Sequence, residues 1–198
     1  MKISTDRLHY WFQAIRKSPD PQRTLDAFWQ GQIRSKEWLI DNISPYIVNN
    51  CCITIYGGWV GVLASMMFES FKNIKHIINV DIDPLVEPIA KIMNQEEYNQ
   101  GKFNAVTKNM VDYTDLSDIV INTSCEHINQ KDYELWLSNI SKNSIIVLQS
   151  NNYIIDEHIR IAKNLDEFVK QSNLNIINLD VLELPLYNRF MLIGKKVV

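Results

Sequence analysis

The sequence predicts an α/β fold in which a mostly parallel sheet is covered by helices on both faces. From about residue 50 onward, short apolar, β-branched segments alternate with segments of helical periodicity. This alternation is typical of a parallel sheet with helices on either side. The last forty residues hold two strand-like segments with no helix between them, which indicates a final antiparallel pair.

The predicted strands are short apolar segments bounded by polar or turn residues. They cover residues 51–56, 76–80, 105–106, 118–122, 144–148, 176–182 and 190–193. We therefore expect a seven-stranded sheet whose last strand is antiparallel.

The predicted helices lie between these strands and carry apolar residues at helical spacing. They cover residues 61–71, 85–93, 133–140 and 155–169. Residues 1–48 form a separate helical, tryptophan-rich segment that Pro19 and Pro21 divide into two pieces. No flexible linker follows it, so we expect it to pack on the sheet of the second unit, residues 49–198, and to serve as a segment or lid beside it.

Composition excludes several classes of protein. The net charge of -3 and the lack of a basic, aromatic-interleaved patch argue against a nucleic-acid partner. The N-terminus lacks the apolar core of a signal peptide, and no apolar run approaches the ~18 residues of a membrane span. The three cysteines lack metal-ligand spacing, so we interpret them as reduced thiols of a cytoplasmic protein. The oligomeric state is not predicted.

Three of the six glycines fall within five residues, in the stretch ITIYGGWVG that ends the first predicted strand. Glycines at a strand-to-helix turn let the backbone approach a ligand, and the following helix offers unpaired N–H groups. Asp81 follows the second predicted strand, twenty residues after Gly61. A carboxylate there is placed to bind both hydroxyls of a ribose. Together these residues predict a site for a nucleotide-like cofactor.

Two registers of the glycines can be compared with known cofactor sites. The dinucleotide pattern G-x-G-x-x-G would fall on Tyr56, Gly58 and Gly61, so its first glycine is missing. The other register, Gly57-x-x-x-Gly61 followed by a helix, a strand and Asp81, resembles the class I S-adenosylmethionine-dependent methyltransferases. The resemblance covers roughly residues 50–196 and implies a three-layer Rossmann-like fold.

The resemblance implies specific roles around S-adenosylmethionine. The glycine turn would pass under the methionine part, Asp81 would bind the ribose, and Ile82 would pack on the adenine. A polar and an apolar side chain would border the adenine, and the end of the fourth strand would face the transferable methyl group. The full set expected to bind the cofactor is Tyr56, Gly57, Gly58, Trp59, Gly61, Asp81, Ile82, Asn109, Met110, Asn122, Ser124 and Lys36.

Two positions depart from the pattern of the family. Ile55 stands where an acidic residue is usual, and Trp59 stands where the middle glycine is usual. The amino group of the cofactor would then need another partner, and Trp59 would crowd or redirect the methionine chain. Lys36 is the predicted partner of the cofactor carboxylate, on a segment around Trp29 that would cover the cofactor.

Candidate substrate and catalytic residues lie after the fourth and fifth strands. Glu126 and His127 are candidate bases, since a methyl acceptor often has to lose a proton. The alternative is that both are loop residues that cap the next helix. Further candidates for contact with the substrate are Cys125, Asn151, Asn152 and Tyr153. No metal site is predicted.

Four functions are consistent with these residues. The first is methyl transfer to a small molecule, because the stretch NTSC replaces the signature of amino-directed nucleic-acid methyltransferases. The second is another group transfer from the same cofactor, or its cleavage. The third is a non-catalytic module that binds the cofactor. The fourth is a dinucleotide oxidoreductase, which the missing first glycine disfavours.

Overall fold

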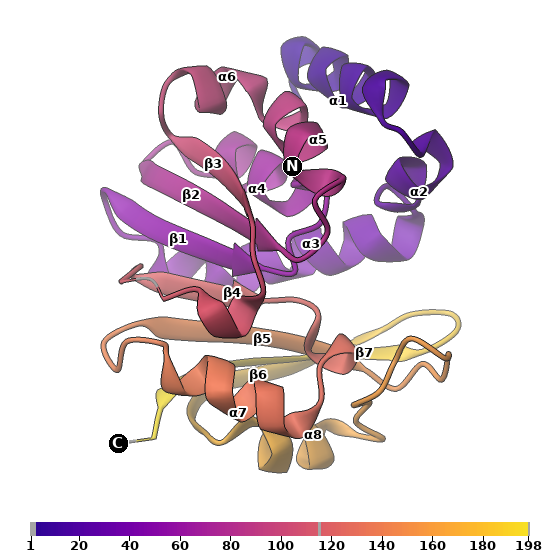
Figure 1. Cartoon of the computed structure of the whole chain (residues 1–198). Coiled ribbons are helices and arrows are strands. Elements are labelled where there is room, and N and C mark those ends of the chain that lie inside the picture. The colour runs from indigo at the N-terminus through magenta and orange to yellow at the C-terminus, as the bar shows by residue number, and fades with distance from the viewer. Residues whose placement is uncertain (1–2, 115, 198) are drawn as a thin grey trace.

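The computed structural model describes residues 3–114 and 116–197. A seven-stranded sheet runs through it in the order β3-β2-β1-β4-β5-β7-β6 (Figure 1). The strands are β1 Cys51–Tyr56, β2 Ile74–Asp81, β3 Phe103–Thr107, β4 Ile119–Asn122, β5 Ile145–Asn151, β6 Leu174–Glu183 and β7 Asn188–Lys196. Only β7 is antiparallel to its neighbours, β5 and β6. The predicted α/β fold and its antiparallel last strand are confirmed.

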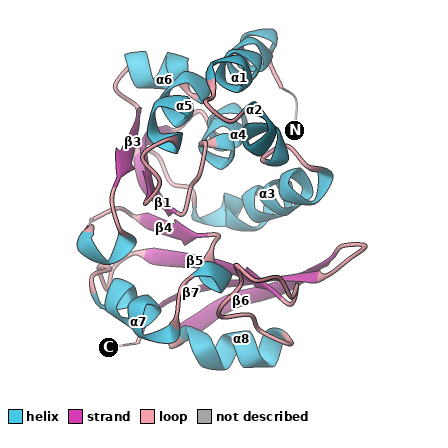
Figure 2. Cartoon of the chain, turned by 45° about the vertical axis from the view of Figure 1, so that its right-hand side comes forward, coloured by secondary structure: helices cyan, strands magenta, loops and turns pink. Residues whose placement is uncertain are grey.

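Helices cover both faces of this sheet (Figure 2). The α-helices are α1 Thr5–Lys17, α2 Pro21–Asp26, α3 Gln30–Ile43, α4 Val62–Ser70, α5 Val86–Met93, α6 Gln95–Asn99, α7 Gln130–Ser138 and α8 Leu165–Ser172. Three short 3-10 helices also occur, η1 Ser44–Tyr46, η2 Met110–Asp112 and η3 Cys125–His127. Residues of α1, α3, α4 and α5 belong to the core on one face of the sheet, and residues of α7 and α8, which lie in the lower half of Figure 1, belong to the core on the other. No helix of the described residues is long and apolar enough to cross a membrane.

The alternation of side chains along β1 divides the core in two. Ile53 and Ile55 point into a cluster with the helices from α1 to α5, whereas Tyr56 points into a cluster with α7 and α8. Successive residues of a strand face opposite sides, so one buried strand supplies both clusters. The sheet is therefore fixed from both faces, and its carboxyl ends form a rigid edge.

The N-terminal segment packs against the helices of one face. Arg7 of α1 is buried, and its guanidinium pairs with Glu97 of α6 at 2.5 Å and with Glu69 of α4 at 3.1 Å. Trp11 donates its indole N–H to Ser65 of α4 at 2.7 Å. The segment has three α-helices instead of the two predicted pieces, because the chain also turns between α2 and α3.

The predicted helix over 155–169 is wrong in its first half. Only α8 is helical, and residues 152–164 form an extended loop (Figure 2). The backbone N–H groups of Ile159 and Arg160 both donate to the carbonyl of Glu126, at 2.9 and 3.0 Å. These long-range bonds replace helical ones, and several apolar residues of the loop face a cavity instead of a helix–sheet interface.

Candidate functional site

A cavity of about 780 Å³ opens at the carboxyl ends of β1, β2, β4 and β5. Its walls come from the glycine turn, the ends of β2 and β4, the end of β5, helix α3 and the loop 152–164. In open α/β sheets, ligands bind at this edge, where the strand order reverses between β1 and β4. The cavity is therefore the candidate functional site.

The glycine turn has a backbone that suits glycine at three positions. Gly57, Trp59 and Gly61 have φ angles of +62°, +50° and +79°. For a residue with a Cβ such a conformation costs roughly 1–2 kcal/mol. Trp59 stands where the methyltransferases that the sequence resembles usually have glycine. The backbone strain at this position arises because tryptophan, unlike glycine, has a Cβ.

Side chains of β2 hold the strained Trp59 in place. Its backbone N–H donates to Asp81 Oδ2 at 2.8 Å, and its carbonyl accepts from Asn79 Nδ2 at 3.0 Å. Asn79 also approaches the turn so closely that a Cβ on Gly58 would lie 1.8 Å from Asn79 Oδ1. Position 58 thus requires glycine for lack of space.

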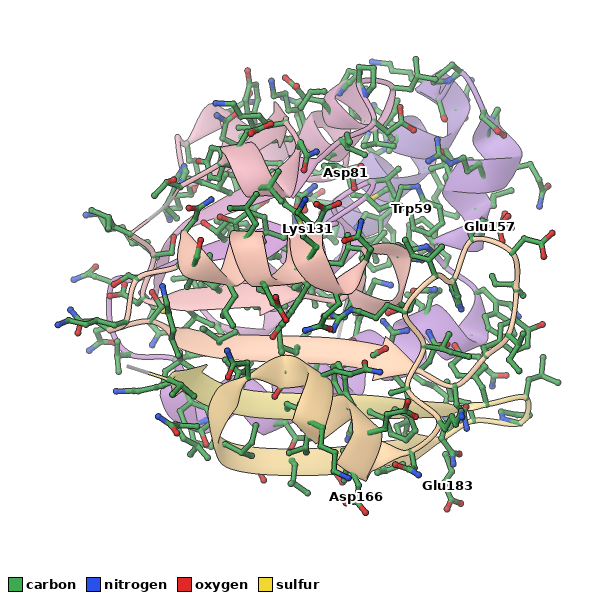
Figure 3. All side chains as sticks on the ribbon, turned by 60° about the horizontal axis from the view of Figure 1, so that its bottom comes forward. Trp59, Asp81, Lys131, Glu157, Asp166 and Glu183 are labelled. Carbon is green, nitrogen blue, oxygen red and sulfur yellow. The ribbon has the colours of Figure 1, made fainter. Side chains whose placement is uncertain are left out.

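Asp81 ends β2 and faces the cavity beside Trp59 (Figure 3). Its Oδ2 accepts from the N–H of Trp59, and its Oδ1 accepts from the N–H of Asp83 at 3.1 Å. A carboxylate oxygen can accept more than one hydrogen bond, so both oxygens keep capacity for hydroxyl groups of a ligand. The carboxylate therefore fixes the turn and remains available to a cofactor.

The cavity wall beyond Asp81 is a mixed polar and apolar surface. Ile82 is 68% exposed, and Asn109 and Met110 lie across from it after β3. Arg23 of α2 pairs with Asp83 and holds the pKa of that carboxyl below its usual value. The N-terminal segment thus reaches this end of the cavity.

Lys36 of α3 forms part of the opposite wall. Its ammonium donates to the side-chain oxygen of Gln32 at 2.9 Å. Burial and, to a smaller extent, the positive charge of Arg189 together lower the pKa of Lys36 to about 7. A partly neutral amine at neutral pH is well placed to gain charge when a carboxylate binds.

Glu126 anchors the far end of the cavity. It is only 3% exposed, and its Oε1 accepts from Arg189 Nη1 at 3.1 Å and from Asn151 Nδ2 at 2.5 Å. Arg189 also donates to the carbonyl of Thr123 at 2.6 Å. The other oxygen, Oε2, is buried without a hydrogen-bond partner. A buried, unpaired carboxylate oxygen on a residue that lines the cavity is a candidate binding group for a cation or a donor.

Two imidazole rings lie close together beside Glu126. The ring centroids of His127 and His158 are 4.8 Å apart in an edge-to-face arrangement. Nδ1 of His127 is 3.1 Å from the carbonyl of Glu157, and Nδ1 of His158 is 2.8 Å from that of Tyr153. Because a carbonyl only accepts, Nδ1 carries the proton in each neutral ring and Nε2 keeps its lone pair.

Most residues predicted for the site line the cavity. They are Lys36, Gly57, Gly58, Trp59, Asp81, Ile82, Asn109, Met110, Ser124, Glu126, His127, Asn151 and Tyr153. Five others lie outside its lining. Tyr56 is buried on the other face, where its hydroxyl donates to the carbonyl of Tyr113 at 3.2 Å. Asn152 pairs with the backbone of Asn188.

The other three residues outside the lining are Gly61, Asn122 and Cys125. Gly61 starts α4, and its carbonyl accepts from Asn94 at 3.0 Å. Asn122 accepts from the N–H of Ser124 at 3.0 Å and thereby shapes the turn after β4. Cys125 is fully buried, and burial raises the pKa of its thiol to about 12. Cys125 therefore lies outside the cavity lining, and its thiol stays protonated at neutral pH.

Solved structures share this architecture. No protein-family model and no curated protein matches the chain. The magnesium protoporphyrin IX methyltransferase ChlM from Synechocystis PCC 6803, with bound SAH, aligns over 98% of this chain and 95% of its own, with a TM-score of 0.69 and 11% identity. The chain has the class I methyltransferase fold.

Other proteins with the class I methyltransferase fold differ in size and activity. The mitomycin 7-O-methyltransferase MmcR matches with a TM-score of 0.66 and 12% identity over 93% of this chain, which spans only 60% of MmcR. The [4+2]-cyclase SpnF matches with a TM-score of 0.66 and 10% identity over 82% of each chain. At these identities the likeness shows the fold alone.

Sequence reasoning missed two residues of the site. His158 fell inside the wrongly predicted helix, and Arg23 gave no signal because its partner lies sixty residues away. Tyr187 precedes β7 and Arg189 lies in it, and both reach the cavity only because β7 is inserted next to β5.

Proposed function

We propose that this protein binds S-adenosylmethionine along the glycine turn and transfers the methyl group to a small molecule held near Glu126. The Asp81 carboxylate carries the proposal. It lies at the end of β2 and faces the same cavity as the turn, and each oxygen accepts only one backbone hydrogen bond. Two free acceptors at this place suit the vicinal hydroxyls of a ribose.

The other wall residues suit the two ends of this cofactor. Ile82 is exposed in the cavity and would pack on the adenine, which Asn109 and Met110 would border. Gly57 and Gly58 line the cavity without side chains, so a methionine chain could pass close to their backbone. Lys36 would pair with the carboxylate of the cofactor and gain a proton as it does so.

The residues beyond the turn would bind and orient the acceptor. S-adenosylmethionine supplies a methyl group on a positively charged sulfur. Ser124 lies against Gly57, where its hydroxyl donates to the Gly57 carbonyl at 3.3 Å, and would face the methyl group. Glu126 and Asn151 would hold a polar group of the acceptor in line with the methyl–sulfur bond. Nε2 of His127 would take the proton that the acceptor loses.

A small acceptor suits the shape of the site. The cavity of about 780 Å³ has to hold cofactor and acceptor together, and the loop 152–164 closes one side of it. The end of the cavity beside the glycine turn and Asp81 is called the cofactor end, and the end beside Glu126 the acceptor end. We further propose that residues 1–48 act as a lid over the cofactor end. The pair between Arg23 and Asp83 and the position of Lys36 in the wall support this role.

A different reaction of the same cofactor is the second candidate. Trp59 puts an aromatic ring into the cavity wall where glycine is usual, and SpnF, which has the same fold, is described as a [4+2]-cyclase. A dinucleotide oxidoreductase is disfavoured, because that fold has the strand order 3-2-1-4-5-6 without an inserted antiparallel strand.

The experiment is a calorimetric titration with S-adenosylmethionine, S-adenosylhomocysteine and NAD, followed by mass spectrometry of the incubated cofactor. Removing Asp81 would also release the turn, so we choose Ile82→Lys as the test variant. Ile82 is exposed, and its replacement should weaken cofactor binding about tenfold through lost apolar contact with the adenine.

Leu116→Lys is the matched control. Leu116 is 86% exposed in the loop before β4, at the end of the strand remote from the cavity, so this variant should bind like the wild type. Binding of NAD alone, or equal affinity of both variants and the wild type, would reject the proposed site. Conversion of the cofactor without an acceptor would favour the second candidate, and binding without turnover on any acceptor would favour a non-catalytic module.

A further inference from the structure

We propose that Glu126, His127 and His158 form a binding site for a divalent transition-metal ion at the acceptor end of the cavity. One ligand atom from each residue lies within 4.8 Å of the others. The three side chains come from η3 and from the loop 152–164, and all three line the cavity. Two imidazoles and one carboxylate are a ligand set that zinc and non-haem iron share.

The carboxylate is the first argument for a ligand here. Glu126 is 3% exposed, and its Oε2 has no hydrogen-bond partner. Its Oε1 already accepts from both Arg189 and Asn151, so these donors fix the side chain and leave the second oxygen free. A buried, unpaired carboxylate oxygen is costly unless something binds it. The Glu126 carboxylate would then bridge a metal ion on Oε2 and the guanidinium on Oε1.

The tautomers of the two histidines are the second argument. Both Nδ1 atoms are held by backbone carbonyls, at 3.1 Å for His127 and 2.8 Å for His158. This arrangement fixes the rings and directs the lone pair of Nε2 outward. Metal-binding histidines characteristically donate their other N–H to a carbonyl or carboxylate in the same way.

The spacing requires a small movement on binding. Ligands at about 2.1 Å from a tetrahedral ion lie roughly 3.4 Å apart, closer than the 4.8 Å limit seen here. His127 is exposed and His158 is partly exposed, so a rotation of these rings can close the gap while buried Glu126 stays in place. The outer positions of the ion would then point into the cavity.

Such an ion would act on the acceptor. A hydroxyl bound to the ion would release its proton to solvent more easily, so the ion would activate an oxygen acceptor, and His127 would serve as a ligand instead of a base. The acceptor would then carry a hydroxyl group. This role depends on the proposed methyl transfer, whereas metal binding itself does not.

The test is a titration of the chelator-treated full chain with Zn²⁺ in competition with a chromophoric chelator, and with Co²⁺ followed by its visible absorption. We expect one equivalent to bind without any cofactor, with a Co²⁺ spectrum that reports nitrogen and oxygen ligands. His127→Gln and His158→Gln should each weaken binding by roughly tenfold or more. His9→Gln, at an exposed residue of α1, should match the wild type.

Thermal unfolding of each variant shows that it is folded, and the exposed positions of the histidines favour this. No saturable binding, or equal affinity in the wild type and both site variants, would overturn the metal site. Titration with S-adenosylmethionine in parallel separates this result from a failure of the proposed function, because the cofactor end does not use these ligands.

Discussion

The two ends of the cavity are built in different ways. At the cofactor end, the turn after β1 is held by Asn79 and Asp81 of the adjacent strand, through their bonds to the backbone of Trp59. At the acceptor end, Glu126 is held by Arg189, sixty-three residues away, and by Asn151. A site made by neighbouring strands leaves a pattern in the sequence, whereas a site made by distant side chains does not.

The largest expected effect comes from the acceptor end. Arg189→Met leaves the buried carboxylate of Glu126 without its counter-ion, and breaking a buried pair costs about 3–5 kcal/mol of unfolding free energy. Denaturant unfolding measures this loss. The double variant Arg189→Met with Glu126→Gln should recover a large part of it, because no uncompensated charge remains.

The difference between the two ends predicts that folded Arg189→Met protein still binds the cofactor. Affinity of Arg189→Met for S-adenosylhomocysteine should stay within about threefold of the wild type, since the ion pair lies beyond the turn. A loss of affinity as large as that of Ile82→Lys would show that the two ends are one coupled unit.

The next effect tests the cofactor end. Gly58→Ala would place a Cβ 1.8 Å from Asn79 Oδ1, so Asn79 has to move and release the carbonyl of Trp59. We expect a loss of about 1–3 kcal/mol and a strongly weakened cofactor affinity. Gly101→Ala is the control. Its φ of +69° gives backbone strain, but no atom lies within 4 Å of the new Cβ. Because backbone strain alone costs Gly101→Ala roughly 1–2 kcal/mol, cofactor affinity is the deciding measurement. Gly101→Ala should keep this affinity, and an unchanged affinity in Gly58→Ala would contradict the steric argument.

The smallest effect concerns Lys36, which lies between the two ends. Burial and Arg189 lower its pKa to about 7 from 10.5, so in this pH range the unfolded chain binds more protons than the folded one. Stability should therefore rise with pH, by about 2 kcal/mol between pH 7 and pH 9. Below pH 7 the amine is charged in both states, and the folded protein carries the full cost of burying the charge.

Lys36→Met provides the check on this pH dependence. Unfolding followed at several pH values should give a flatter profile over the same range, because the group responsible is gone. If the wild-type profile is already flat, Lys36 is charged and solvated at neutral pH. Its proposed gain of a proton on binding a carboxylate would then be withdrawn.

The strands could be predicted well from the sequence because each one is a continuous run of apolar residues. The range 51–56 matched β1 in full, and the antiparallel pair at the end followed from two strands without a helix between them. Most residues expected at the cofactor end also line the cavity. Their positions follow from strand ends, which the parallel arrangement brings to one edge.

The acceptor end could be predicted only in part. Ile155 and Ile159 are spaced like residues of a helix, but the carbonyl of Glu126 takes the backbone N–H of Ile159, and both side chains line the cavity. Periodicity cannot distinguish a helix–sheet interface from an apolar cavity wall. His158 was hidden for the same reason, because its position depends on where the loop is attached.

The attachment of the loop 152–164 has an evolutionary consequence. Backbone bonds join it to the carbonyls of Glu126 and Asn151, which any residue at those positions would provide. The side chains that it turns toward the cavity are therefore free to change while the attachment persists. Replacement of residues within this one loop could therefore change the acceptor while the cofactor end stays the same.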